Sequence, residues 1–208
     1  MRLVVTSDTH NQHDDLVVPD GDVFVHAGDF TGHGSFGEVE QFGAWLGRLP
    51  HARKVVIAGN HEFAFEEDPA RARAALGDVD YLEDSAVEID GVRFWGSPWQ
   101  PEFMGWAFNL PIGERLAAVW SRIPDDTDVL ITHGPPQGIL DDTPRGEAVG
   151  CPDLRRRVAA VRPRFHLFGH IHESFGEHEE HGTRFLNLSA WDHRAGEVRS
   201  PVVLDLEP

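Results

Sequence analysis

Five short segments of the chain carry side chains of the types that bind metal ions, and each follows an apolar, strand-like run. They are Ser7–His10, Gly28–Phe30, Gly59–Glu62, Thr132–Pro135 and Gly169–His172. Alternate residues of an extended segment face the same side, so Asp8 and His10 can face one ion, as can His170 and His172. Taken singly, each segment has an ordinary explanation as a turn, a helix N-cap or a solvated strand end. Five of them in one chain indicate a metal site.

The donor atoms of this set indicate which metals it would hold. It combines two aspartates, one asparagine and four histidines, namely Asp8, Asp29, Asn60, His10, His133, His170 and His172. Oxygen and nitrogen donors together suit Mn²⁺, iron, Zn²⁺ or Co²⁺ better than Ca²⁺. Seven ligands are more than one such ion needs, whereas a bridging carboxylate could join two ions roughly 3.5–4 Å apart, as in phosphoryl-transfer enzymes. The number of ligands therefore predicts a binuclear centre.

The elements between these segments alternate as in an α/β protein. Apolar and β-branched runs predict strands at residues 3–6, 23–26, 54–58, 128–132, 165–168, 183–188 and 202–206. Apolar periodicity and helix-start signals predict helices at 36–49, 68–76 and 153–161, and another within 110–123. Asp90-Gly91, between residues 85–89 and 92–95, predicts a β-hairpin with a type I′ turn. Because the carboxyl ends of parallel strands gather along one sheet edge, the five segments should converge in one crevice.

The stretch from Gly96 to Leu110 is aromatic, interrupted by proline and glycine, and fits no regular element. Long irregular loops of this kind often carry function. We expect Trp99, Phe103, Trp106 and Asn109 to line a substrate pocket, as parts of a lid that could stack on a nucleobase. The alternative for each aromatic residue is packing in the core.

Length and composition limit the class of protein. With 208 residues, 40% hydrophobic and 25% charged, the chain is expected to form a single domain over residues 1–208. The 35 acidic and 18 basic residues give a formal net charge of -17, which excludes a dedicated binder of duplex nucleic acid. No apolar run reaches the roughly 20 residues of a membrane span, and no signal-peptide pattern follows Met1, so we expect a cytoplasmic protein without a membrane partner. The sole cysteine, Cys151, permits no internal disulfide, and the oligomeric state stays open.

The order of the five motifs, D-x-H, G-D, G-N-H-E, T-H-G and G-H-x-H, resembles that of the calcineurin-like metallophosphoesterases. The resemblance extends from about Val4 to His172, which is most of the chain. The G-N-H-E motif at Gly59, the GSPWQPEF segment at Gly96 and the T-H-G-P-P segment at Thr132 are similar to the small metallophosphoesterase-domain-containing (MPPED-like) branch. The resemblance implies an α/β sandwich of two mixed β-sheets flanked by helices, with the metal site at the carboxyl ends of strands.

The resemblance also implies a role for each motif residue. It implies a first metal held by Asp8, His10 and His172, a second held by Asn60, His133 and His170, and a bridge from Asp29. His61 would not be a ligand and would stabilise the transition state or protonate the leaving oxygen. Glu62 stands where the family usually has an aspartate that orients this histidine, and we expect Glu62 to be able to orient it as well.

Together these features predict a metal-dependent phosphoesterase that uses no protein nucleophile. Two divalent ions, first Mn²⁺ with iron, Zn²⁺ or Co²⁺ as alternatives, would supply a bridging hydroxide that attacks phosphorus in line. The resemblance implies a phosphodiesterase acting on cyclic nucleotides or other small phosphodiesters. The alternatives are a phosphomonoesterase, including a protein phosphatase, a non-catalytic metal-binding scaffold, and a nuclease restricted to very short substrates.

Overall fold

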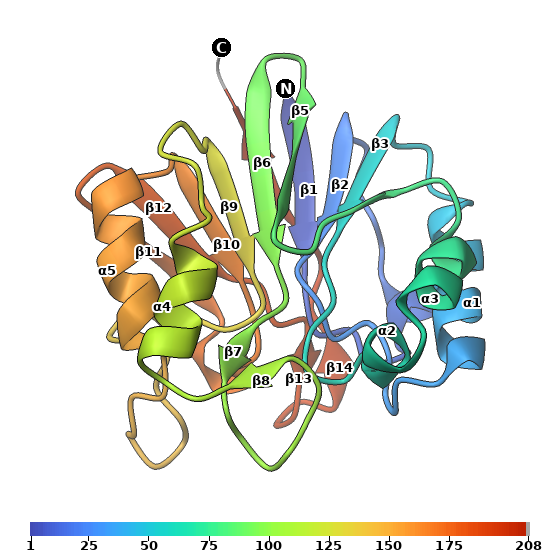
Figure 1. Ribbon diagram of the computed structural model, residues 1–208. Coiled ribbons are helices and arrows are strands. Elements are labelled where there is room, and N and C mark those ends of the chain that lie inside the picture. Colours follow the sequence, from blue (N-terminus) through green and yellow to red (C-terminus); the bar gives the residue numbers. More distant parts are fainter. Residues whose placement is uncertain (207–208) are drawn as a thin grey trace.

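A computed structural model describes residues 1–206 of the chain. Two β-sheets pack face to face, and helices cover the outer face of each sheet (Figure 1). This arrangement confirms the predicted α/β sandwich of two mixed sheets flanked by helices. In residues 1–206 no helix is long and apolar enough to cross a membrane.

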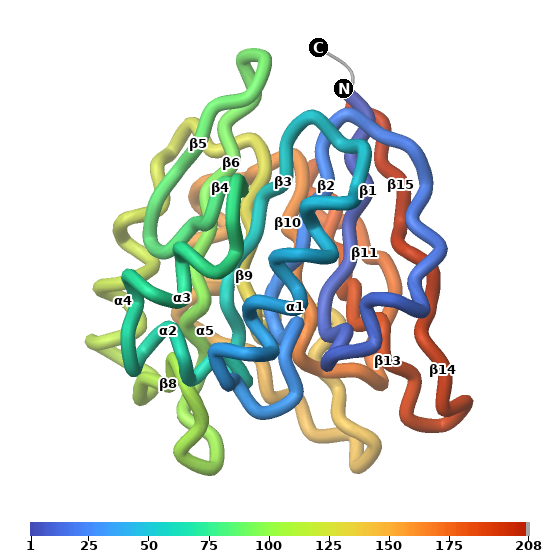
Figure 2. The backbone as a smooth tube through the Cα atoms, turned by 90° about the vertical axis from the view of Figure 1, so that its right-hand side faces the viewer, coloured from blue at the N-terminus to red at the C-terminus, as the bar shows by residue number. Residues whose placement is uncertain are grey.

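The first sheet consists mainly of parallel strands from the N-terminal part of the chain. Its order is β15 (Val202–Asp205), β1 (Arg2–Thr6), β2 (Val23–His26), β3 (Arg53–Val56) and β4 (Asp80–Tyr81). Strands β1 to β4 are parallel, and β15 runs antiparallel to β1, so the last described residues lie beside the N-terminus (Figure 2). Because β1, β2 and β3 are parallel neighbours, the residues that follow them lie at one edge of the sheet.

The second sheet combines a parallel centre with antiparallel edges. Its order is β11 (Gly176–Glu180), β12 (Thr183–Asn187), β10 (Phe165–Phe168), β9 (Val129–Thr132), β6 (Val92–Ser97) and β5 (Ser85–Ile89). Strands β12, β10, β9 and β6 are parallel, whereas β11 and β5 each form an antiparallel pair with their neighbour. The turn between β5 and β6 has positive φ at Asp90 (50°) and Gly91 (79°), as the predicted type I′ hairpin requires.

Alternation along the strands divides the apolar residues among three cores, one between the sheets and one under the helices on each outer face. Between the two sheets lies a core that includes Leu3, Val25, Ile57, Phe94, Ile131 and Leu167. The alternate residues of the first sheet face outward and pack with the helices above them, among them Val4, Phe24 and Val56. A slip of one residue in any of these strands would exchange the two faces, so the core specifies the register.

Helices cover both outer faces. Helices α1 (Phe36–Leu46), α2 (Phe63–Glu67) and α3 (Pro69–Leu76) lie over the first sheet, and α4 (Glu114–Trp120) and α5 (Pro152–Val161) lie over the second (Figure 1). Helix α1 begins at Ser35, whose side chain forms a capping box with Glu38. Helix α5 begins after Cys151, whose buried sulfur accepts hydrogen bonds from Trp120 Nε1 and Leu154 N. This cysteine therefore has a structural role.

Short elements surround the edge where the parallel strands end. They are the strands β7 (Gln100–Pro101), β8 (Asn109–Leu110), β13 (Trp191–Asp192) and β14 (Glu197–Val198) and the 3-10 turns at His13–Asp15 and His172–Ser174. Strands β7 and β8 pair with each other inside the loop of residues 96–110, which is thus partly regular. The helix predicted for residues 36–49 ends at Leu46, where Gly47 forms its C-cap.

Candidate metal centre

The carboxyl ends of five parallel strands carry the predicted metal ligands. Asp8 and His10 follow β1, Asp29 follows β2, Asn60 follows β3, His133 follows β9, and His170 and His172 follow β10. Three of these strands belong to the first sheet and two to the second, so the site lies across the junction of the two sheets. The structure brings all seven residues to this junction.

The backbone turns sharply where these strands end. Asp8, His10, Asp29 and His170 have left-handed backbone angles, with φ of 52°, 42°, 56° and 70°. This conformation is costly for residues other than glycine and is concentrated at functional sites. The loops after β1 and β10 also lie so close together that residue 169 must lack a side chain, because a Cβ atom on Gly169 would lie 1.9 Å from Asp8 Oδ2. The ends of β1 and β10 therefore approach each other more closely than a side chain at residue 169 would permit.

The first cluster of ligand atoms consists of Asp8, His10 and His172, whose donor atoms all lie within 4.8 Å of one another. His172 Nε2 lies 3.3 Å from Asp8 Oδ1 and 3.2 Å from His10 Nε2. Asp8 is held from outside the cluster, because its Oδ2 accepts hydrogen bonds from His170 N at 3.0 Å and from Ser189 Oγ at 3.0 Å. The carboxylate therefore has its second oxygen turned toward the histidines.

The second cluster consists of Asp29, His133 and His170 and obeys the same 4.8 Å limit. His133 Nε2 lies 3.3 Å from Asp29 Oδ2 and 2.9 Å from Asn60 Oδ1, so Asn60 adds an oxygen to this group. Asp29 Oδ2 is also 4.0 Å from His10 Nε2 of the first cluster. Asp29 thus lies between the two clusters, in the place predicted for a bridging carboxylate.

Three of the histidines are held in the tautomer that suits a metal ligand. The Nδ1 atom of each lies within hydrogen-bond distance of a backbone carbonyl oxygen. These oxygens belong to Thr31 for His10 at 3.2 Å, Ala27 for His133 at 3.0 Å and Trp191 for His172 at 2.9 Å. A carbonyl can only accept, so Nδ1 carries the proton and donates it. In the neutral ring, the lone pair of Nε2 then faces the cluster.

The electrostatics of the buried carboxylates favour a positive charge at this place. Burial alone would raise the pKa of Asp29, but the positive charge on His133 outweighs it and holds this pKa well below its usual range. Burial alone would lower the pKa of His133, yet the charge of Asp29 outweighs it and raises this pKa to about 9. His133 Nε2 thus holds a proton beside Asp29 and Asn60. A metal ion could take the place of that proton, so the residues present fit a cation.

His61 and Glu62 are arranged differently from the expectation. His61 Nδ1 lies 2.7 Å from the carbonyl oxygen of Gly32, which holds the ring, and its Nε2 lies 3.9 Å from Asp29 Oδ2. The Glu62 carboxylate is fully buried and accepts hydrogen bonds from the backbone N–H groups of Gly59, Asp29 and Thr31 and from the Thr31 hydroxyl. Glu62 therefore joins the loops after β2 and β3, while Gly32 does the orienting that was expected of Glu62. Burial and the charge of Asp29 raise the pKa of Glu62 to about 7.

Comparison with known proteins decides the family. The model of the family described as calcineurin-like phosphoesterase matches residues 1–174. The chain belongs to this family. It is 43% identical to the metallophosphoesterase domain-containing protein 1 of Homo sapiens, over 99% of this chain and 71% of the human protein. It is 42% identical to a UPF0046 protein of Caenorhabditis elegans, over 91% of this chain and 69% of that protein. The predicted resemblance to this family is thereby confirmed.

Solved structures agree on the fold of this phosphoesterase. One crystal structure superposes with a TM-score of 0.71 at 14% identity and covers 89% of both chains. The crystal structure of TT1561 of Thermus thermophilus superposes with a TM-score of 0.62 at 14% identity, covering 95% of this chain and 96% of that one. At this level of identity the likeness bears on the fold alone.

A cavity of about 550 Å³ opens above the candidate metal ligands of this family member. His10, Asp29, His61, His170 and His172 form part of its lining, so any molecule in the cavity would contact the candidate centre. Two of the four aromatic-loop residues expected at a pocket, Phe103 and Trp106, also line it. The Trp106 ring meets the edge of the His61 ring with centroids 4.6 Å apart.

The other two residues expected at the pocket, Trp99 and Asn109, support the loop from behind. Trp99 packs between two of the hydrophobic cores and donates a hydrogen bond from Nε1 to Asp84 Oδ2 at 3.2 Å. Asn109 donates from Nδ2 to the carbonyl of Phe103 at 2.8 Å and accepts from Gln100 Nε2 at 2.9 Å. The expectation that Trp99 and Asn109 line the pocket is corrected. The composition of the loop does not distinguish a residue that lines the cavity from one that packs behind the lining.

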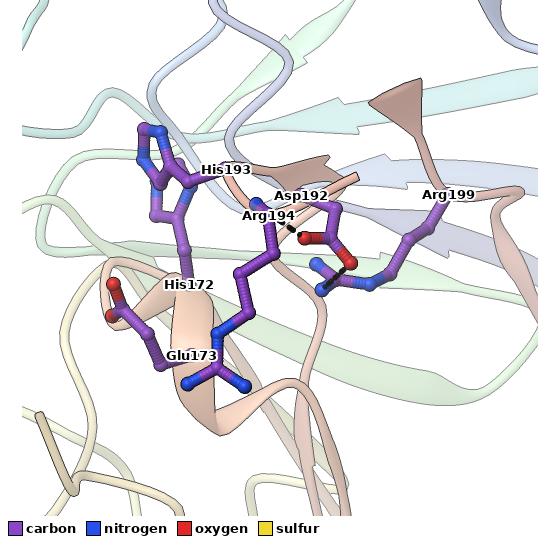
Figure 3. Close-up of a pocket in the computed structure, with 6 residues that line it drawn as sticks. All are labelled: His172, Glu173, Asp192, His193, Arg194 and Arg199. Carbon is purple, nitrogen blue, oxygen red and sulfur yellow. Dashed lines mark hydrogen bonds and ion pairs between the residues drawn. The ribbon is translucent and has the colours of Figure 1, made fainter. Parts of the chain in front are cut away.

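Two further wall residues of the cavity lie in the segment that follows β12. Trp191 and His193 line the cavity, and the His193 ring stacks on His172 with centroids 4.6 Å apart (Figure 3). Trp191 Nε1 donates a hydrogen bond to His193 Nδ1 at 3.1 Å. Both residues follow β12, which is parallel to β10 and ends at the same edge. The position after a further parallel strand was the signal that could have identified Trp191 from the sequence.

Proposed function

We propose that this phosphoesterase is a metal-dependent phosphodiesterase that hydrolyses small phosphodiesters, cyclic nucleotides among them, with the help of two divalent ions. The observation that carries the proposal is the position of Asp29 between two clusters of ligand atoms at the floor of a cavity. Mn²⁺ is the first candidate for both ions, and iron, Zn²⁺ or Co²⁺ would suit the same mixture of donors.

The two clusters divide the ligands between the two ions. Asp8, His10 and His172 would hold one ion, Asn60, His133 and His170 would hold the other, and Asp29 would contact both. When bound, such ions activate a water molecule for attack on phosphorus and neutralise negative charge on the phosphate oxygens. The protein contributes positioned ligands, because the ring hydrogen bonds and the hydrogen bonds that Asp8 accepts from His170 N and Ser189 Oγ fix the donor atoms.

His61 would serve the leaving group. Its Nδ1–H donates a hydrogen bond to the Gly32 carbonyl oxygen, so only Nε2 can donate a proton to the substrate. Nε2 faces Asp29 from the cavity wall at 3.9 Å, and the Trp106 ring packs against the imidazole. A proton transferred from Nε2 to the leaving oxygen would let an alcohol depart instead of an alkoxide. The ring then needs to regain this proton from water before the next turnover.

The shape of the cavity supports a substrate with groups on both sides of phosphorus. A volume of about 550 Å³ falls within the range of sites for small molecules and far exceeds what inorganic phosphate fills. Trp106 and Trp191 offer aromatic surface to a base or another flat group. A phosphodiester, which carries two ester groups, uses such a cavity more fully than a small monoester.

The experiment that tests the proposal compares substrates and metals. The protein is stripped of metal, Mn²⁺ is restored, and hydrolysis of bis-p-nitrophenyl phosphate, p-nitrophenyl phosphate and the 2′,3′- and 3′,5′-cyclic nucleotides is measured. We expect turnover of the diesters to depend on the metal and to disappear in Asp29→Ala. The matched control is Asp15→Ala, which removes an exposed carboxylate and should retain the activity.

The remaining outcomes separate the alternatives. A preference for p-nitrophenyl phosphate over the diesters would make the protein a phosphomonoesterase. Absence of turnover with Mn²⁺, Fe²⁺, Zn²⁺ and Co²⁺ alike, in protein that binds these ions, would make it a metal-binding scaffold.

A further inference from the structure

A second hollow of about 370 Å³ adjoins the metal cavity. It lies between the loop that carries β7 and the segment that leads into α5, and its apolar lining includes Pro101, Phe103, Ile112, Pro135, Val149 and Ile171. We call it the apolar groove. Phe103, His170 and Ile171 line both the groove and the metal cavity, so the two are continuous.

Several apolar side chains that line the groove are exposed to solvent. Phe103 is 55% exposed, Ile112 57% and Val149 38%. Single exposed apolar residues are common, but three of them around one concave surface mark a binding site. The volume of the groove also lies within the usual range for ligand pockets.

Charge indicates which kind of ligand group the groove would accept. Glu102 lines it and brings a carboxylate. The chain as a whole carries a formal net charge of -17, so a further anionic group would be repelled here. An uncharged apolar group would instead bury itself against Ile112 and Val149 and gain the free energy of leaving water.

We propose that the apolar groove binds one ester arm of the substrate, so that the preferred substrates are phosphodiesters with an apolar alkyl or aryl arm. This inference rests on the proposed function. His170 at the mouth of the groove belongs to the second ligand cluster, whereas His61 lines the metal cavity and would protonate the leaving oxygen. The groove therefore takes the arm that stays on phosphorus. In the reaction, the oxygen of water bonds to phosphorus, the bond to the other ester oxygen breaks, and that oxygen leaves with a proton.

The test varies the retained arm and keeps the leaving group constant. Methyl p-nitrophenyl phosphate and hexyl p-nitrophenyl phosphate, both below any micelle-forming concentration, are compared by the kcat/KM of the Mn²⁺-loaded protein. Full burial of one methylene group favours binding about fourfold. Five additional methylene groups in a partly open groove should raise kcat/KM about tenfold or more.

Two variants locate the effect in the groove. Val149→Asp and Ile112→Asp place a carboxylate on its wall at exposed positions, where the fold should tolerate it, and each should abolish the preference for the hexyl arm. The matched control is Val17→Asp, at a residue that is 78% exposed and does not belong to the groove lining, and it should retain the preference. Equal kcat/KM for both arms in the unaltered protein, or an unchanged ratio in both groove variants, would overturn the inference.

A binding measurement separates failure of the groove from failure of the proposed function. Calorimetric titration of hexyl phosphate and methyl phosphate into the Mn²⁺-loaded protein should show the hexyl compound binding about tenfold tighter or more. Equal affinities would overturn the groove. Tighter binding of hexyl phosphate without hydrolysis of any diester would overturn the proposed phosphodiesterase and leave the apolar groove as a binding site.

Discussion

At the scale of single residues, the candidate site depends on which nitrogen of each histidine ring already forms a hydrogen bond. His10, His133 and His172 each donate Nδ1–H to a backbone carbonyl and direct Nε2 inward. His61 uses the same bond, to Gly32, but lies on the wall of the cavity. The same type of contact therefore orients the three rings proposed as metal ligands and the ring proposed as proton donor.

This assignment of His61 predicts a dependence on the leaving group. In His61→Asn the leaving oxygen receives no proton from the protein, and a general acid typically contributes about 100-fold or more to the rate. We expect kcat for methyl phenyl phosphate to fall by about this factor, and kcat for methyl p-nitrophenyl phosphate to fall far less, because nitrophenolate leaves readily without a proton. Steady-state kinetics of both diesters with the Mn²⁺-loaded protein provide the measurement.

A neighbouring histidine provides the control for this prediction. His33→Asn alters a side chain that is 93% exposed, so both rates should stay unchanged. An equal loss for the two leaving groups in His61→Asn would contradict proton donation and would assign His61 to the stabilisation of charge in the transition state.

At the scale of elements, the centre exists because loops from two sheets approach closely. Gly169→Ala tests this approach, because the added Cβ would lie 1.9 Å from Asp8 Oδ2 and 2.3 Å from Ser7 Oγ. The end of β10 must then move away from β1, which separates His172 from Asp8. Changes that displace metal ligands typically cost about 10- to 100-fold in metal affinity, and we expect a loss of this size in a Mn²⁺ titration by calorimetry.

The control for this glycine lies in α1. A Cβ on Gly37 meets nothing within 4 Å, so Gly37→Ala should leave the Mn²⁺ affinity unchanged and raise the stability of the protein by about 0.5–1 kcal/mol. Unchanged Mn²⁺ affinity in Gly169→Ala would mean that the two loops can separate without disturbing the ligands.

Elements of the fold differ in how well the sequence predicts them. The strands that end at the site are buried, apolar runs followed by polar residues, and that contrast predicts both the strand and its ligand. Helix α2 has five residues, too few to show a repeating apolar pattern, and was not predicted. Strand β11 is Gly-Glu-His-Glu-Glu at a sheet edge, and because its pairing with β12 needs no apolar pattern, it was not predicted.

The side chains of the site also differ in how well the sequence predicts their positions. The positions of Asp8 and His170 at the candidate centre were predictable, because residue type and strand position together indicate a candidate ligand. The contact of Glu62 with Gly59 and Thr31 was not, because it depends on how the loops after β2 and β3 lie in space. The prediction that Trp99 lines the pocket was wrong for a related reason, because an aromatic ring fits a core and a cavity wall equally well.

At the scale of the whole molecule, the two sheets are joined by a core to which both contribute. Buried strand patterns indicate that sheets exist, but they do not say which strands share a sheet, and the expectation of two packed sheets came from the resemblance to the family. The consequence is chemical, because the ligands of each candidate metal come from both sheets. Any loosening of one sheet against the other would therefore weaken the metal site.

The stability of the molecule also depends on pH through His166, which lies in β10 with no exposed surface and contacts Phe168 and Phe185 on the helix-covered face of the second sheet. Its Nε2 lies 2.8 Å from Thr132 Oγ1, and its Nδ1 has no hydrogen-bond partner among residues 1–206. Burial lowers the pKa of His166 from 6.5 to about 3, so below pH 6.5 the unfolded chain binds a proton that the folded chain does not. Stability therefore falls as the pH falls from 6.5 toward about 3.

In His166→Gln neither the folded nor the unfolded chain binds a proton at this residue. Between pH 6.5 and pH 5 the histidine should account for a loss of about 2 kcal/mol in the free energy of unfolding, and the variant should lack that part of the loss. The measurement is urea unfolding of both proteins at pH 7 and pH 5 with a chelator present, so that metal release does not contribute. The glutamine is expected to lower stability at both pH values, and only the difference between them bears on the prediction. An equal decrease in the two proteins would mean that His166 is protonated in the folded state.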